Sequence, residues 1–150
     1  MNIVITLDYE LYFGSQPGSA ERTLLEPTEA LCLLARMHGL PLVFFVDALW
    51  LLRLREQAPT HPALMAEHYR VTRQLEQCAA AGHELQLHLH PHWQDSHWDG
   101  QAWRMDLRRY RLHDFDDASI ADMVQRSCAL LRSLAGAHAA RAFRAGGWCI

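Results

Sequence analysis

The sequence predicts an α/β fold in which strands and helices alternate along a parallel sheet. Short apolar runs at residues 2–7, 42–46 and 84–89 suit strands, helical patterns separate them, and glycines end the helical patterns. Units of this kind can close into a barrel, and a barrel of eight units needs about 250 residues. We therefore expect this chain of 150 residues to form a single domain, residues 1–150, containing roughly the first half of a parallel (β/α) barrel.

The first strand–helix unit covers the first forty residues. Residues 2–7 predict a strand of β-branched and aliphatic residues, which ends at Asp8 and Glu10. Pro27 opens a helix, and Gly39 is placed to end it. The apolar residues that share one face of this helix, and that we expect to point inward, are Ala30, Leu31, Leu34 and Met37.

The later units follow the same order. Residues 42–46 form a continuous apolar run, typical of a strand covered on both faces. A helix is expected from about Thr60 to Gly82, and residues 84–89 predict the third strand. Residues 93–117 have little periodicity and predict a long loop.

The last predicted elements are a helix and a strand. Asp116 or Asp117 is expected to cap a helix that Gly136 ends, and residues 141–144 begin a further strand.

Composition excludes several classes of protein. The 14 basic and 17 acidic residues leave a net charge of −3, which argues against a nucleic-acid binder. The sequence has no signal peptide and no apolar run long enough to cross a membrane, so we expect a cytoplasmic protein with no membrane partner. Cysteines that stand singly, without a CxxC pair, are expected to be structural thiols; they are Cys32, Cys78, Cys128 and Cys149.

Histidines are concentrated in one segment of the chain. His88, His90 and His92 alternate around the end of the third strand, and alternation would send all three to one face. Pro91 argues against a regular continuation, so we expect the strand to end near His88 and the chain to turn, which lets His88 and His92 converge on a metal ion. His83 and His97 are expected to be ordinary half-buried polar residues.

Carboxylates and an arginine follow other predicted strands. Asp8 and Glu10 share a face of the first strand, with Tyr9 on the other, although a solvated acidic turn has the same spacing. Because parallel barrels collect functional groups at their carboxyl strand ends, these groups and the histidines are expected to meet there. Arg144 would hold a carboxylate by paired hydrogen bonds, and Asp47 is a weaker candidate for the same pocket.

Three segments, in order, resemble the motifs of the polysaccharide deacetylase (NodB-like, carbohydrate esterase) family. Thr6-Leu7-Asp8-Tyr9-Glu10 resembles its T-F-D-D motif. Gly82-His83-Glu84-Leu85, followed by His88-Leu89-His90-Pro91-His92, resembles G-H-E-I followed by H-T-x-x-H. Phe143-Arg144-Ala145-Gly146-Gly147 resembles F-R-x-P-x-G, with Gly146 where proline is usual.

The resemblance implies a metal-dependent hydrolase that removes an acetyl group, as an amide or less often an ester, from an N-acetylated sugar or polysaccharide. It makes Asp8 the general base, oriented by Arg144. It places a divalent ion, expected to be zinc, on His88 and His92, and Glu10 would supply the third ligand because Tyr9 occupies the position of the family's second aspartate. The remaining candidates for the substrate pocket are His90, Trp93, Tyr9 and Trp148.

Other interpretations of the same residues stay open. The chain ends before the family's later motifs, so we expect either a homo-oligomer or a missing C-terminal half. A different metal-dependent barrel hydrolase, of the amidohydrolase or phosphoesterase type, would use an HxH pair. A carbohydrate- or metal-binding remnant without catalysis would use aromatic residues of the long loop to stack on sugar rings; these are Trp93, Trp98, Trp103 and Tyr110.

Overall fold

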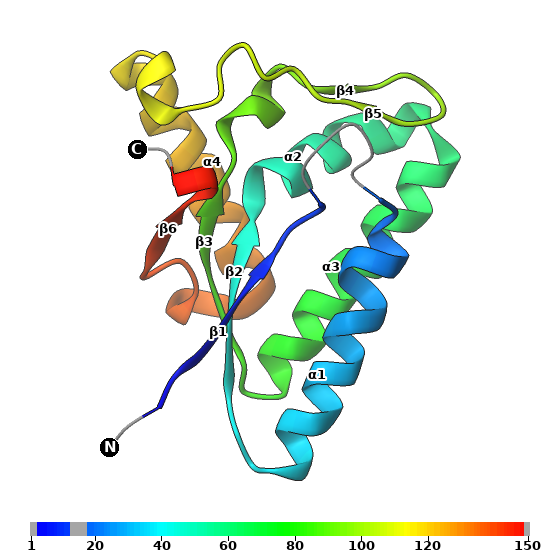
Figure 1. The fold of residues 1–150 in the computed structure, drawn as a ribbon, viewed down its shortest axis with the longest axis vertical. Helices are drawn as coiled ribbons and strands as arrows, with labels where there is room; N and C mark the ends of the chain where they lie inside the picture. Colours follow the sequence, from blue (N-terminus) through cyan, green and yellow to red (C-terminus); the bar gives the residue numbers. More distant parts are fainter. Residues whose placement is uncertain (1–2, 13–17, 149–150) are drawn as a thin grey trace.

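A curled parallel sheet forms the centre of the molecule (Figure 1). The structure is a computed structural model that describes residues 3–12 and 18–148, apart from the side chain of Trp148. The sheet has the strand order β1-β2-β3-β6. Its strands are β1 (Ile5–Tyr9), β2 (Leu42–Asp47), β3 (Glu84–Leu89) and β6 (Phe143–Ala145).

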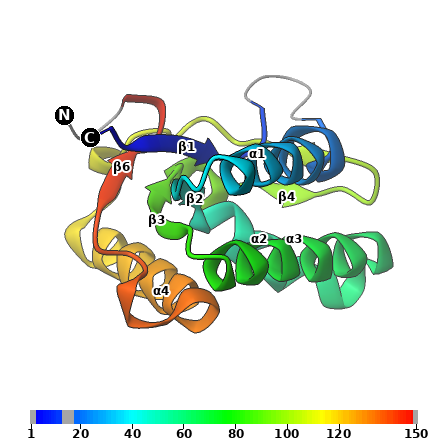
Figure 2. The ribbon, with the colours of Figure 1, turned by 90° about the horizontal axis from the view of Figure 1, so that it is seen from below.

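The helices cover the outer side of this sheet (Figure 2). They are α1 (Glu26–Met37), which follows the π-helical turn η1 (Glu21–Leu25), α2 (Ala48–Gln57), α3 (Pro62–Ala80) and α4 (Asp117–Ala135). No helix in the described ranges is both long and apolar enough to cross a membrane. The α/β class and the parallel strand–helix order are therefore confirmed, while the described residues form an open, curled sheet and not a closed barrel.

The two faces of the sheet differ in chemistry because side chains alternate along each strand. The face toward the helices is apolar: Val46 of β2 is fully buried, and Phe44 and Leu85 are each 1% exposed. The inner face is mostly polar, since the register places Asp8 beside Phe45 and Phe45 beside Gln86. The polar groups of the described sheet are thus gathered on its inner face.

Helix α1 is rotated relative to the prediction. Of the residues expected to point inward, Leu34 is 54% exposed and Met37 is 69% exposed. Thr28 and Ala35 are buried in their place. The most apolar stripe of α1 is therefore not the face that the fold buries, since tertiary context overrides the local pattern.

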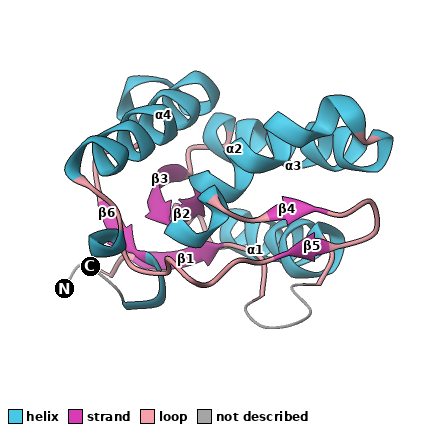
Figure 3. Cartoon of the chain, turned by 90° about the horizontal axis from the view of Figure 1, so that it is seen from above, coloured by secondary structure: helices cyan, strands magenta, loops and turns pink. Residues whose placement is uncertain are grey.

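The loop predicted at residues 93–117 contains a short hairpin, β4 (His97–Trp98) with β5 (Trp103–Arg104) (Figure 3). Asp99 forms its turn, because its carboxylate accepts from the backbone N–H groups of residues 101 and 102, each at 2.8 Å. The ring centroid of Trp103 lies 5.2 Å from that of Trp93 and 5.7 Å from that of Trp98, in edge-on arrangements. These tryptophans thus pack against one another.

The last strand is attached to β3 by a buried glutamine. Gln86 is 4% exposed, and its Oε1 accepts from the backbone N–H groups of Arg141 and Ala142, each at 2.8 Å. Its Nε2 donates to Glu84 at 2.9 Å. Gln86 thereby fixes the approach of the chain to β6.

We expect Gln86→Leu to lower the free energy of unfolding by about 1–3 kcal/mol, because two backbone N–H groups lose their acceptor. Urea denaturation followed by circular dichroism measures the change. Gln125→Leu, on an exposed position of α4, is the matched control and should differ little from the wild type. Equal stability of the two variants would show that the Gln86 side chain does not hold β6.

Candidate metal centre

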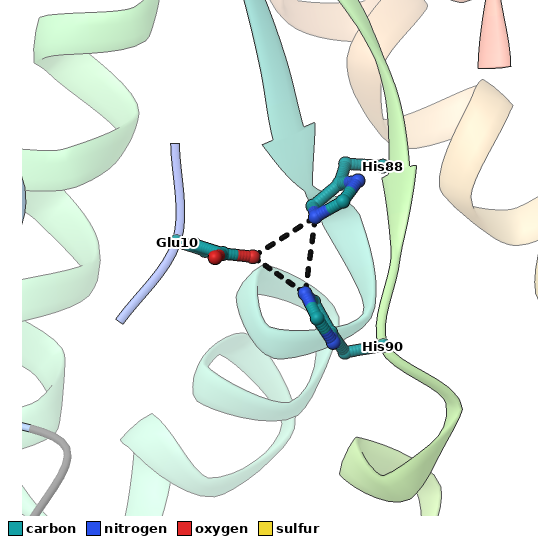
Figure 4. Close-up of side chains that lie close together, drawn as sticks. All are labelled: Glu10, His88 and His90. Carbon is teal, nitrogen blue, oxygen red and sulfur yellow. Dashed lines mark hydrogen bonds and ion pairs between the residues drawn. The ribbon is translucent and has the colours of Figure 1, made fainter. Parts of the chain in front are cut away.

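Three side chains from separate parts of the sheet converge at the carboxyl end of its strands (Figure 4). Glu10 Oε2 lies 2.9 Å from His88 Nε2 and 2.5 Å from His90 Nε2, and the two histidine nitrogens are 3.0 Å apart. The side chains of His88 and His90 are 3% and 2% exposed, whereas that of Glu10 is 25% exposed. The group is therefore nearly buried and reaches solvent on the Glu10 side.

Alternation along extended backbone brings the three residues together. His90 directly follows β3 and keeps an extended conformation, with φ −112° and ψ 96°, so its ring lies on the same face as that of His88. Glu10 directly follows β1 and shares the face of Asp8. The predicted association of Glu10 with His88 is present in the structure, and His90 joins them.

His92, predicted as the second histidine ligand, is not part of this group. Pro91 begins a 3₁₀ turn, Pro91–Gln94, which carries His92 away from the extended line of β3. The fully buried His92 ring lies parallel to that of Tyr110, with centroids 5.9 Å apart. The geometry therefore favours His90 over His92 as the partner of His88.

The hydrogen bond that His88 makes through Nδ1 determines whether its Nε2 carries a hydrogen. His88 Nδ1 lies 2.9 Å from the carbonyl oxygen of Arg144, and because a carbonyl only accepts, Nδ1 carries a hydrogen. In a neutral imidazole this leaves a lone pair on Nε2, directed at Glu10 and His90. A hydrogen bond of this kind orients histidines in known metal sites.

The negative charge of Glu10 and a positive charge on His88 stabilise each other. Burial opposes ionisation of Glu10, but the hydrogen bonds from His88 and His90 outweigh it and hold the pKa of that carboxyl at about 2. Burial likewise opposes protonation of His88, while its contacts with Glu10 and the charge of Asp47 raise its pKa above the usual value. Glu10 is thus a carboxylate at neutral pH, in a site that favours a positive charge beside it.

The donor set fits a divalent metal ion. Two imidazoles and one glutamate, with a further position open, form the ligand set of several catalytic zinc sites, and similar ions accept the same donors. Ligands about 2.0–2.1 Å from a tetrahedral ion lie about 3.3 Å apart. The present separations of 2.5–3.0 Å would need to widen by about 0.3–0.8 Å, most of it between Glu10 and His90.

A second polar pair crosses the inner face of the sheet. Arg144 of β6 forms an ion pair with Asp8 of β1 and donates to Thr6 Oγ1 at 2.7 Å. Its guanidinium also lies 4.0 Å from the centre of the Phe45 ring. The structure thus brings together the two residues predicted as general base and orienting arginine, and it adds Thr6 and Phe45, which the sequence analysis did not identify.

Asp47 lies next to the metal candidates without being one of them. It is 1% exposed, pairs in register with His88, and caps α2 by accepting from the Trp50 N–H at 3.4 Å. Burial raises the pKa of Asp47, and the neighbouring His90 and His88 act in the opposite direction. Its main structural role is the helix cap.

The residues expected to line a substrate pocket are placed differently. Tyr9 is 2% exposed and points to the helix side, where its hydroxyl donates to Gln74 at 3.0 Å. Trp93 is 2% exposed and packs on other tryptophans. Neither side chain offers a surface to a substrate, because both are enclosed by other side chains, and the side chain of Trp148 lies outside the described residues.

His83 and His97 lie outside the group, as expected, but neither is half-buried, since His83 is buried and His97 is exposed. His83 Nδ1 accepts from the Leu42 N–H at 3.1 Å, and His97 is exposed on β4.

Gly146 lies directly against the ring of His90, one of the three residues of the group. A Cβ at this position would lie 2.4 Å from the Leu89 carbonyl oxygen and 2.5 Å from His90 Nδ1, so only glycine allows the chain to pass this close to the His90 ring.

Comparison with known proteins finds no matching family model, no matching curated protein and no matching solved structure. The resemblance to polysaccharide deacetylases stays a prediction from sequence motifs. The candidate metal centre rests on geometry and donor chemistry.

Matched substitutions distinguish His90 from His92. We expect His90→Phe to weaken zinc binding by more than about 100-fold, because a ligand is lost, while His92→Phe changes it only a few-fold and retains the stacking on Tyr110. Isothermal titration calorimetry of the two variants and of His88→Ala measures the affinities. Loss of binding in His92→Phe with retention in His90→Phe would restore the original assignment.

Burial of His92 predicts a loss of stability in acid. Burial, together with the charge of His90, lowers the pKa of His92 to about 3 in the folded chain, against about 6.5 when unfolded. Its contribution is complete above pH 6.5 and falls as the pH drops toward 3, at up to about 1.4 kcal/mol per pH unit. Urea denaturation between pH 7 and 4, with chelator present, should show a shallower decline for His92→Phe. Parallel curves for the two proteins would contradict this prediction.

Proposed function

We propose that the chain is a metal-dependent hydrolase that removes an acetyl group, as an amide rather than an ester, from an N-acetylated sugar or polysaccharide. The observation that carries this proposal is the Glu10, His88 and His90 group, located on the same face of the sheet as the Asp8–Arg144 pair. The first arrangement supplies donors for a divalent ion, and the second supplies a carboxylate in a fixed orientation. The sugar and the acetyl group come from the motif resemblance.

Each residue has a defined task in this proposal. An ion held by Glu10, His88 and His90 would supply Lewis acidity to the carbonyl of the substrate. Asp8 accepts the proton of the attacking water, and Arg144 fixes the direction of its carboxylate. Alternation places Asp8 and Glu10 two residues apart on one face, about 7 Å along the strand, so one small group could contact both the base and the residues that would hold the ion.

Arg144 connects the two parts of the site. Its guanidinium binds Asp8 and Thr6, while its backbone carbonyl accepts from His88 Nδ1. The strand β6 therefore orients the proposed base with a side chain and a proposed ligand with its backbone. A displacement of β6 is expected to disturb both.

A second candidate function is favoured by the identity of the histidine pair. His88 and His90 form an HxH pair on one extended segment, which is the arrangement expected of amidohydrolase-type or phosphoesterase-type metal hydrolases. These enzymes would use the same three ligands on a different substrate. For the remaining alternative of a non-catalytic sugar-binding remnant, Trp93 and Trp103 are each at most 5% exposed and offer no face to a sugar, whereas Trp98 and Tyr110 are partly exposed.

The decisive assay measures two products from one zinc-loaded sample. We expect acetate release from N-acetylglucosamine oligomers and no phosphate release from p-nitrophenyl phosphate. Asp8→Asn should lower kcat by about 10²–10⁴-fold while zinc binding, measured in parallel, is retained. Asp122→Asn, at a side chain that is 60% exposed on α4, is the matched control and should retain full activity.

The outcomes separate the candidates. Phosphate release without acetate release would replace the deacetylase by the phosphoesterase alternative. Bound zinc with neither product would contradict both hydrolase proposals, and absence of zinc binding would contradict the metal centre itself.

A further inference from the structure

A groove lies between α1 and α3, away from the metal candidates, and its lining extends from Glu21 and Leu25 to Gly39 and Gly82. Its volume is about 1000 Å³, and its floor includes the turns that lead into β2 and β3, at Leu40 and Gly82. Both helices line it, and Cys32 of α1 and Cys78 of α3 face one another there. No part of the proposed hydrolase site uses this groove.

The sulfur atoms of Cys32 and Cys78 form a direct contact between these helices. Cys32 Sγ lies 3.7 Å from Cys78 Sγ, although the residues are 46 positions apart in the sequence. Cys78 is 4% exposed, whereas Cys32 is partly exposed and reachable from the groove. A disulfide brings its sulfur atoms to about 2.05 Å, so a small movement of one helix is sufficient.

Of the two helices, α1 is the more exposed. Much of its surface faces solvent, including Leu34 and Met37. Helix α3 carries the fully buried Val71 and Leu75, and its Gln74 hydrogen-bonds to Tyr9 and to the Leu25 carbonyl at the start of α1. Closure therefore requires a small adjustment that falls mainly on the more exposed helix, α1.

We propose that Cys32 and Cys78 are an oxidation site whose disulfide fastens α1 to α3 and narrows the groove. The oxidant is a low-molecular-weight disulfide. The Cys32 thiolate attacks it, forming a mixed disulfide and releasing one small thiolate. The Cys78 thiolate then attacks the sulfur of Cys32 and releases the second, so two protein thiols lose two protons and two electrons while one small disulfide becomes two thiols.

Burial controls the rate of this exchange. It raises the pKa of Cys78 to about 12, and it also raises that of Cys32, partly offset by the contact with Cys78. Since thiolates are the reacting species, the exchange is slow at neutral pH and faster in alkali. The more accessible Cys32 is the first to react.

The test uses the full chain with Cys128→Ser and Cys149→Ser, so that only the pair remains. Glutathione disulfide is added at pH 7 and 8.5, and thiols and intact mass are followed. Trypsin then releases Cys32 in the peptide 23–36 and Cys78 in the peptide 74–104. Cys78→Ser in the same background is the matched control.

We expect both thiols to disappear with a mass loss of about 2 Da, the two peptides to become linked, and the melting temperature to rise by several degrees because the unfolded chain is constrained. The Cys78→Ser control should stop at a glutathione adduct on Cys32. A stable adduct in the protein that retains both cysteines, or two thiols that persist at pH 8.5 until the chain is unfolded, would overturn the proposal.

Discussion

Alternation of side chains along four parallel strands is the constraint on which the rest of the structure depends. Because of this alternation, most apolar side chains of the sheet face the helices, while carboxylates, imidazoles and an amide lie on the inner face. Those polar groups need partners, and they find them across the curl of the sheet: Arg144 on one edge strand reaches Asp8 and Thr6 on the other. The same alternation aligns Glu10, His88 and His90. Core, inner face and candidate metal site are thus consequences of one periodicity.

The order of elements was predictable because short strand-like runs alternate with helical patterns that end near Gly39, Gly82 and Gly136. The partnership of Glu10 with His88 was also predictable, from alternation and the common direction of parallel strand ends. The predicted ligand His92 lies outside the group that the geometry brings together, and His90 lies in it. Pro91 does not turn the chain at His88, because a proline disfavours the helical conformation in the residue before it. That preference keeps His90 extended and carries the alternation one step further.

Other features depend on contacts that a sequence does not display. The buried face of α1 is determined by its neighbours, so Leu34 and Met37 are exposed although they continue the most apolar stripe. Tryptophans of the long segment pack on one another within a hairpin whose turn depends on Asp99. The hydrogen bond from His88 to the Arg144 carbonyl joins positions 56 residues apart. Each of these features depends on contacts between segments, and neither segment alone carries a sequence pattern that predicts the contact.

The hydrogen bond from His88 Nδ1 is also the strongest argument that the group is built for a cation. With that hydrogen committed to the Arg144 carbonyl, a neutral His88 turns a lone pair toward the Glu10 carboxylate, 2.9 Å away, and two acceptors at that distance repel. A positive species must lie between them, either a proton or a metal ion. A proton on His88 meets this need for the pair alone: burial opposes it, but the contacts with Glu10 and the charge of Asp47 raise the pKa of His88. A divalent ion accepts the lone pairs of Glu10, His88 and His90 together and removes this conflict.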